Sequence, residues 1–154
     1  MTIEPLSELH AAELCRWRYE APYDVYNWPD WTDMKKDGIE FGDPVLRVQQ
    51  YRSVLDPSGE LVGYAQLFPL GDVVRLGLGL RPGLCGRGLG ERLVRTIAQE
   101  ALRSSHGAQI DLEVFVWNSR AIRAYEKAGF RIEDTYMRPV KGAEQECHCM
   151  VYYP

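Results

Sequence analysis

Residues 76–90 read LGLGLRPGLCGRGLG, and two different repeating patterns meet in this stretch. Leucine alternates with glycine in the first part, as side chains alternate along a strand. From Leu89 onward the apolar residues recur every three or four positions, which is typical of one face of a helix. The stretch therefore predicts a strand over residues 72–80, a glycine-rich turn and a helix over residues 88–103.

The glycine turn has the composition of an anion site. Gly86, Gly88 and Gly90 have no side chains that would cover the backbone N–H groups where the helix begins. Such N–H groups, together with the positive end of the helix dipole, bind phosphate groups, and Arg87 adds a positive charge. A diphosphate is therefore the expected ligand, and a tight strand-to-helix turn without any ligand is the alternative.

The two common nucleotide-binding motifs do not fit this turn. A P-loop needs lysine after its last glycine, but Leu89 follows Gly88. A dinucleotide fingerprint needs Gly-x-Gly-x-x-Gly, whereas the spacing here is Gly-x-Gly-x-Gly. Gly77 and Gly79, in the preceding strand, indicate a bend, a close approach by another group, or room for a helix.

The remaining sequence predicts further strands and helices around this unit. Ser7 is a candidate N-cap for a first helix with an apolar stripe, and residues 56–59 form a hairpin turn. Residues 22–42 read as short helix pieces and loop. The stripe consists of Leu9, Ala12, Leu14 and Trp17; the other expected strands span residues 2–5, 45–55, 61–68, 110–116, 130–136 and 146–153, and a last helix spans residues 119–127.

This order of elements indicates an α/β fold of the mixed α+β kind. We expect a single domain over residues 1–154, with one central, mostly antiparallel mixed sheet of about six or seven strands and helices on both faces.

Composition excludes several classes of protein. The chain has 154 residues, of which 45% are hydrophobic and 26% charged, and its net charge is −4. No apolar run reaches membrane-spanning length, and the acidic balance argues against a nucleic-acid partner. The absence of a signal-like start and the free-thiol pattern predict a cytoplasmic location. Cys147-His148-Cys149 alternates faces on a strand and has no second ligand pair, so no metal is expected.

A second informative stretch is residues 112–130, LEVFVWNSRAIRAYEKAGF. With it, the chain resembles the GCN5-related N-acetyltransferase (GNAT) superfamily. The family pattern Asn-x-x-Ala-x-x-x-Tyr-x-x-x-Gly-Phe is matched by Asn118, Ala121, Tyr125, Gly129 and Phe130. The resemblance covers about residues 45–154.

The family's diphosphate motif, Gln/Arg-x-x-Gly-x-Gly/Ala, falls on residues 85–90. Gly88 and Gly90 match it, and Cys85 departs from its first position. The resemblance implies acetyl-CoA as the acyl donor, with its pantetheine arm in a gap between splayed fourth and fifth strands. It also implies an oxyanion stabilised by a strand N–H near Leu80. The expected cofactor-binding residues are Leu78, Leu80, Cys85, Gly86, Arg87, Gly88, Leu89, Gly90, Asn118, Ala121 and Tyr125.

Two residues are candidates for proton transfer. The resemblance makes Tyr125 the general acid that protonates the departing CoA thiolate, and core packing is its alternative role. Glu113 is the candidate base, acting through water, on the strand face that also carries Asp111 and Phe115. A solvated strand charge is its alternative role, and bulk water is the alternative base. Other family members have a glutamate on the fourth strand, where this chain has only Asp72 and Arg75.

The N-terminal third is rich in aromatic and acidic residues, a combination suited to an ammonium group. The resemblance places the acceptor wall there, with core packing as the alternative. The candidate substrate-binding residues are Tyr23, Tyr26, Trp28 and Trp31.

The expected activity is acyl-CoA-dependent N-acyl transfer, most simply of acetyl, to a primary amine of a small molecule or a peptide N-terminus. It would proceed by direct attack in a ternary complex. A non-catalytic CoA-binding or sensor module on the same fold is the alternative. No membrane partner is expected, and the oligomeric state, a homodimer included, stays open.

Overall fold

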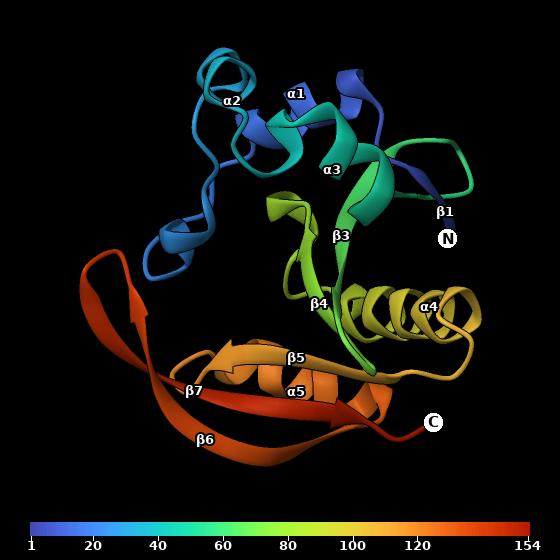
Figure 1. Ribbon diagram of the computed structural model, residues 1–154, viewed down its shortest axis with the longest axis vertical. Coiled ribbons are helices and arrows are strands. Elements are labelled where there is room, and N and C mark those ends of the chain that lie inside the picture. Colours follow the sequence, from blue (N-terminus) through green and yellow to red (C-terminus); the bar gives the residue numbers. More distant parts are fainter. The chain divides into compact units, whose positions relative to one another are not determined.

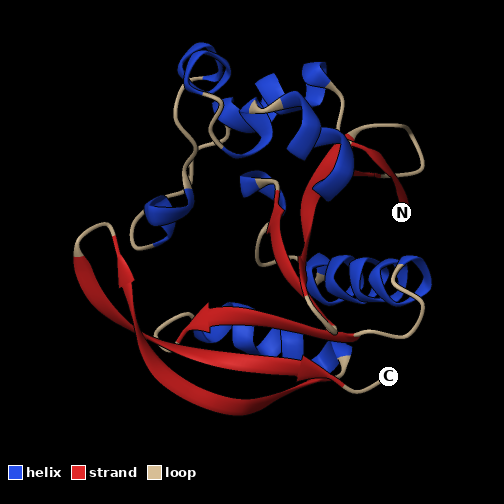
Figure 2. Cartoon of the chain, in the orientation of Figure 1, coloured by secondary structure: helices blue, strands red, loops and turns tan.

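The computed structural model describes residues 1–154 and contains one sheet of seven strands. Hydrogen bonds join the strands in the order β1-β2-β3-β4-β5-β7-β6, and strands and helices are distinguished in Figure 2. β4 and β5 are parallel, whereas the β1–β2, β2–β3, β5–β7 and β6–β7 pairs are antiparallel. The predicted fold class, a mixed and mostly antiparallel sheet with helices, is confirmed.

The chain divides into two compact units, which are described separately. The first contains residues 1–66 and 79–85, and the second contains residues 67–78 and 86–154. Both β3 (Leu61–Leu70) and β4 (Val73–Leu80) pass from one unit into the other. That residues 1–154 behave as a single domain stays a prediction.

The first unit contains two whole strands, parts of two others and a group of short helices (Figure 1). Its core is a cluster of buried aromatic and aliphatic side chains that includes Phe41, Tyr51 and Met34. Its elements are β1 (Thr2–Pro5), α1 (Glu8–Arg16), α2 (Trp31–Asp37), α3 (Pro44–Gln50), β2 (Tyr51–Leu55), the start of β3 and the end of β4. Three 3₁₀ turns, Tyr23–Tyr26, Glu40–Gly42 and Pro82–Leu84, complete the unit.

Local signals in this unit are partly confirmed. Ser7 caps α1 by accepting a hydrogen bond from the backbone N–H of His10 at 3.1 Å. Gly59 closes the predicted hairpin turn with φ +89°. The predicted stripe of α1 is right in part: Leu14 and Trp17 are buried, whereas Leu9 is 76% exposed and Ala11 and Cys15 complete the buried face.

The prediction of a strand from residue 45 is wrong, because residues 44–50 form α3 and the strand begins at Tyr51. The Asp43 side chain accepts a hydrogen bond from the backbone N–H of Val45 at 2.8 Å. Pro44 occupies the first helical turn, where its missing N–H costs nothing. These helix-start signals prevail over the strand preference of the β-branched residues Val45 and Val48.

The second unit contains a sheet of β4, β5, β7 and β6, with the helices α4 and α5 packed together on it (Figure 1). The predicted helical face of α4 is confirmed, since Leu93, Val94 and Ile97 are buried. On β5, Leu112 and its alternate neighbours are buried in the same way. The elements are α4 (Leu89–Ser104), β5 (Gln109–Phe115), α5 (Ser119–Ala128), β6 (Phe130–Val140) and β7 (Ala143–Tyr152).

The last two strands are longer than predicted. Their pairing continues from Phe130–Tyr152 to Val140–Ala143, although residues 137–146 are mostly polar. Backbone hydrogen bonds hold this outer part of the hairpin, which the apolar pattern alone does not reveal. No helix in the chain combines the length and apolar character needed to cross a membrane.

Candidate functional site

β4 and β5 separate before they end. Their parallel pairing runs from Val73–Gln109 to Leu76–Leu112. β4 nevertheless continues to Leu80, and β5 continues to Phe115 while pairing with β7. Beyond Leu76, therefore, the backbone of β4 that had faced β5 has no strand pairing on that side, as strands that splay require.

The glycine turn leaves the start of α4 open. Gly86 and Gly88 have φ angles of +79° and +75°, and a Cβ atom at either position would meet no atom within 4 Å. Gly88 is the N-cap residue of this 16-residue helix, and no side chain accepts from the N–H groups of the first turn. These unsatisfied N–H groups, with the helix dipole behind them, are a site for an anionic ligand.

Helix α5 lies against the same end of α4. A Cβ atom at Gly90 would lie 3.4 Å from the Cβ of Ala124, an ordinary van der Waals distance, so the first turn of α4 packs directly against α5. Tyr125 is the next residue on α5, and its ring lies 6.1 Å from that of Phe130 in a tilted arrangement. The structure thus brings the glycine turn and the helix of Tyr125 together.

The ends of α5 follow the sequence signals. The Asn118 side chain accepts a hydrogen bond from the backbone N–H of Ala121 at 3.2 Å and so caps the helix. Gly129 ends it in a left-handed conformation, with φ +113°. A Cβ atom at Gly129 would approach the carbonyl oxygen of Tyr153 to 3.0 Å, so two constraints favour glycine there.

Glu113 lies within a network of polar side chains. Its Oε2 atom accepts a hydrogen bond from the hydroxyl of Tyr136 on β6. Its Oε1 atom lies 3.3 Å from Nη1 of Arg138 and 3.5 Å from Nη1 of Arg75. The Glu113 side chain is only 15% exposed, so it is not the solvated strand charge that was the alternative. Whether it acts as a base stays a prediction.

Arg75 links this carboxylate to a second one. Its guanidinium group makes two hydrogen bonds to Asp111, at 3.0 and 2.9 Å, in addition to its contact with Glu113. Asp111 is buried, and such a bidentate pair fixes both side chains. Burial and the neighbouring Asp111 raise the pKa of the Cys149 thiol to about 11, so that thiol stays protonated.

Sequence reasoning missed Tyr136. Simple alternation would place it on the same face of β6 as Phe130 and Ile132. The pairing shifts between Ile132 and Asp134, however, so that Tyr136 lies opposite Cys147 and reaches Glu113. Such a bulge reverses the face of every later residue, and no sequence signal marked it.

In the first unit, each of the last residues of β4 and the residue after it contacts a different neighbour. A Cβ atom at Gly79 would lie 2.4 Å from Cε1 of Tyr64, so the close approach expected from the strand glycines is that of a tyrosine ring. The hydroxyl of Tyr19 donates to the carbonyl oxygen of Leu80 at 2.7 Å. The backbone N–H of Arg81 donates to the carbonyl of Val62 at 2.8 Å.

The aromatic residues of this unit pack around Phe41. The Trp28 ring lies edge-on to Phe41 at 4.8 Å and to Tyr64 at 6.0 Å. Burial raises the pKa of Tyr64 to about 12. The buried Trp28 Nε1 has no well-formed hydrogen bond. The Trp28 indole nevertheless lies near Tyr64, where it partly offsets the rise in the Tyr64 pKa. Tyr23 and Tyr26 bound one 3₁₀ turn.

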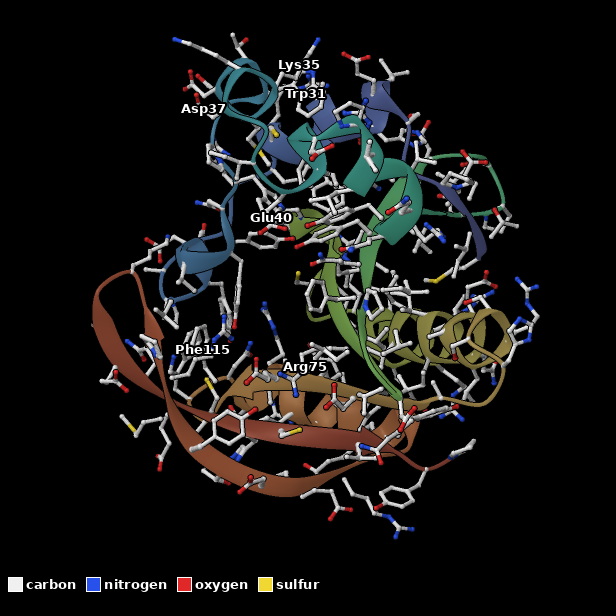
Figure 3. The ribbon with its side chains drawn as sticks, viewed as in Figure 1. Trp31, Lys35, Asp37, Glu40, Arg75 and Phe115 are labelled. Atoms are coloured by element: carbon white, nitrogen blue, oxygen red, sulfur yellow. The ribbon has the colours of Figure 1, made fainter.

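Trp31 differs from the other predicted substrate-binding residues. Its ring stacks on Phe41 at 6.1 Å, with Lys35 at 5.7 Å and Arg47 at 5.5 Å from its centre (Figure 3). The protein's own cations therefore already occupy positions that an acceptor ammonium group would take. This arrangement weakens the case for Trp31 as part of the acceptor wall.

No group of three or more His, Cys, Asp or Glu side chains is arranged to hold a metal ion. All four cysteines are free thiols. His148 bonds to Thr135 at 2.8 Å, whereas the Cys149 thiol lies 3.5 Å from Asp111.

A family model described as the acetyltransferase (GNAT) family matches residues 9–130. Among solved structures, AAC(6')-Ib in complex with ribostamycin and coenzyme A is similar, with a TM-score of 0.76 and 26% sequence identity over 98% of this chain and 92% of that chain. The same protein with paromomycin and acetyl-CoA gives a TM-score of 0.76 and 25% identity, over 98% of this chain and 92% of that chain.

A spermidine N-acetyltransferase, a SpeG chimera from Vibrio cholerae and hSSAT, is also similar. It has a TM-score of 0.76 and 17% identity, over 98% of this chain and 93% of that chain. At this identity the likeness concerns the fold alone.

Proposed function

The chain belongs to the acetyltransferase (GNAT) family, and from this we propose that it transfers an acetyl group from acetyl-CoA to a primary amine of a small molecule or a peptide N-terminus. Acetyl-CoA and the amine would be bound together, and the amine would attack the thioester directly. The single observation that supports acetyl-CoA as the acyl donor is the start of α4, which follows Gly86 and Gly88 and has no side-chain cap.

That helix start suits the diphosphate of CoA. Backbone N–H groups bind the phosphate oxygens without needing a particular side chain, which is why Cys85 is acceptable where the family has Gln or Arg. Arg87 and Leu89 flank the site through their backbone. Asn118 and Ala121 support it indirectly, because their hydrogen bond fixes the start of α5.

The pantetheine arm would pair with the open side of β4. Because the N–H of Arg81 faces β3, the N–H of Leu80 faces away from β3 by strand alternation. The same holds for Leu78. The Leu80 carbonyl already accepts from Tyr19, so the Leu80 N–H would be the group that binds the oxygen of the thioester.

The reaction needs three proton transfers. The amine nitrogen attacks the carbonyl carbon, the carbon–sulfur bond then breaks, and the thiolate takes a proton from the Tyr125 hydroxyl. The nitrogen gives up its second proton as the amide forms, and that proton returns through water to the Tyr125 phenolate. The amine arrives mostly protonated, so a base must remove a proton before attack. We assign this to Glu113 acting through water, with the network of Tyr136, Arg75 and Arg138 holding its carboxylate in place.

The acceptor class is supported by likeness and by composition. The AAC(6')-Ib structure that is 26% identical holds ribostamycin. The aromatic residues Tyr23, Tyr26 and Trp28 lie in a segment that also carries Glu20 and Asp24, and aromatic faces with carboxylates favour cationic amines. We therefore place small polyamines and aminoglycosides first among acceptors and peptide N-termini second.

Release of free CoA thiol from acetyl-CoA, measured against a panel of amines, tests the proposal. The panel contains aminoglycosides, spermidine and short peptides with free N-termini, and mass spectrometry identifies the acetylated product. Amine-dependent thiol release with a matching product is expected. Tight CoA binding with no turnover on any amine would instead support a non-catalytic CoA-binding module.

A further inference from the structure

We propose that Tyr19 is a positioning residue for the acyl-transfer step: its hydroxyl fixes Leu80 so that the Leu80 N–H is directed at the thioester oxygen. The inference rests on the proposed function and adds a residue that the family motifs do not contain. It concerns a contact between residues 61 positions apart, formed wholly within the first unit.

The contact itself is well formed. The Tyr19 hydroxyl donates to the Leu80 carbonyl at 2.7 Å, which is the usual length for an O–H···O bond. The backbone of Tyr19 is held as well, because its N–H donates to Oδ1 of Asn27 at 2.8 Å. Tyr19 also packs against the buried core of this unit. The phenol is therefore a fixed donor with little freedom to leave the carbonyl.

The residues on either side of Leu80 are fixed by different contacts. The ring of Tyr64 occupies the space beside Gly79, and Arg81 bonds to β3 through both its backbone and its side chain, at 2.8 Å to Val62 and 3.1 Å to Leu61. The Leu80 carbonyl faces away from β3, although it shares its peptide plane with the Arg81 N–H. On that side the carbonyl accepts from the Tyr19 hydroxyl at 2.7 Å, and the Cys85 thiol lies farther away, at 3.9 Å. The Tyr19 bond is the shorter of these two contacts on the side of Leu80 that faces away from β3.

This matters because an oxyanion donor works only when it is aimed in advance. A backbone N–H stabilises the developing charge when it already points at the oxygen, and a small misplacement lowers the rate strongly. A hydrogen bond to the carbonyl of Leu80 restricts rotation of that residue and hence the direction of its N–H. Tyr19 therefore acts through Leu80 and does not touch the substrate itself.

The test compares the wild type with Tyr19→Phe, which keeps the ring and removes the hydroxyl. Tyr153→Phe is the matched control, since it removes a tyrosine hydroxyl that bonds to Glu133 at the surface. The infrared spectrum of bound acetyl-CoA, isotope-labelled at the acetyl carbonyl, reports hydrogen bonding to that oxygen without any acceptor. Turnover, the KM for acetyl-CoA and the melting temperature are measured alongside.

In the wild type and in Tyr153→Phe, we expect the bound carbonyl band to lie below its frequency in water. In Tyr19→Phe the carbonyl band should move back toward its frequency in water. The kcat should fall about tenfold, the fold-change that corresponds to losing roughly one net hydrogen bond. The KM for acetyl-CoA and the melting temperature should be nearly unchanged. Asn27→Ala, which loosens the backbone of Tyr19, should shift the band in the same direction by less.

Two results overturn the inference. An equal carbonyl shift in wild type and Tyr19→Phe means that Leu80 is aimed without Tyr19. No shift in the wild type, despite acetyl-CoA binding and turnover, means that no donor lies on the carbonyl. Both results leave the proposed function intact, whereas failure of the wild type to bind acetyl-CoA contradicts the proposed function itself.

Discussion

The hydroxyl of Tyr136 on β6 donates a hydrogen bond to the Glu113 carboxylate on β5, across the intervening strand β7. Burial, and secondly this bond, raise the pKa of Tyr136, so it remains a protonated donor at any working pH. Arg75 and Arg138 contact the other oxygen of Glu113. The carboxylate is thus held in a fixed position on the face of the sheet opposite the buried Leu112 and Val114.

Replacing Glu113 with glutamine should slow turnover most at low pH. The substitution keeps the shape and removes the base, and low pH is where most of the amine is protonated and proton removal limits the rate. The measurement is turnover from about pH 6 to about pH 9, at saturating acetyl-CoA and acceptor.

Tyr136→Phe is the control for that experiment. It removes a donor to Glu113 but keeps the carboxylate, so turnover should fall less than in Glu113→Gln. An unchanged pH–rate profile in Glu113→Gln would show that water alone removes the proton.

Tyr125→Phe should lower kcat by about 10²-fold, the lower end for loss of a general acid. The low end applies because a thiol, with a pKa near ~8.5, is already a fair leaving group. The ring keeps its contact with Phe130, so CoA affinity and melting temperature should change little. Steady-state kinetics and calorimetry check this, and equal turnover in both proteins would leave Tyr125 with packing alone.

Stability should fall as the pH rises above about 9. Burial raises the pKa of the Cys15 thiol from 9.0 to about 11. Between these values the unfolded chain loses the proton and the folded chain keeps it, so the unfolded state binds fewer protons and the free energy of unfolding decreases with pH. Tyr64 acts in the same sense at higher pH, because burial raises its pKa to about 12.

Cys15→Ala isolates this contribution. Lost packing lowers the free energy of unfolding equally at every pH, whereas loss of the thiol should flatten the decline by up to about 1.4 kcal/mol per pH unit. Urea unfolding at a series of pH values measures both effects. Parallel curves for wild type and Cys15→Ala would show that the thiol does not contribute.

Features that depend on a few neighbouring residues could be predicted from the sequence. The left-handed Gly88 and Gly129 and the caps at Ser7 and Asn118 follow from local conformational rules. The strand preference of Val45 and Val48 failed because the Asp43–Pro44 cap is the stronger local signal.

Contacts between distant residues could not be predicted. Tyr19 and Leu80 meet only because β4 ends beside the segment that follows α1. Tyr136 reaches Glu113 only because one bulge in β6 changes which face it occupies. Neither the strand order nor a single inserted residue leaves a periodic trace in the sequence.

The central claim is that the open start of α4 holds the diphosphate of CoA, and calorimetric titration of CoA tests it most directly. The three proteins compared are the wild type, Gly88→Val and Gly107→Val. Gly107 is the matched control, because it too has a positive φ, +91°, and open space around it, but lies beyond the other end of α4. Both variants therefore carry the same kind of backbone strain.

We predict micromolar CoA affinity for the wild type, a common level for metabolic ligands. Gly107→Val should retain that affinity, and Gly88→Val should lose it, because the new side chain covers the N–H groups that would hold the phosphates. Unchanged CoA affinity in Gly88→Val would contradict the account.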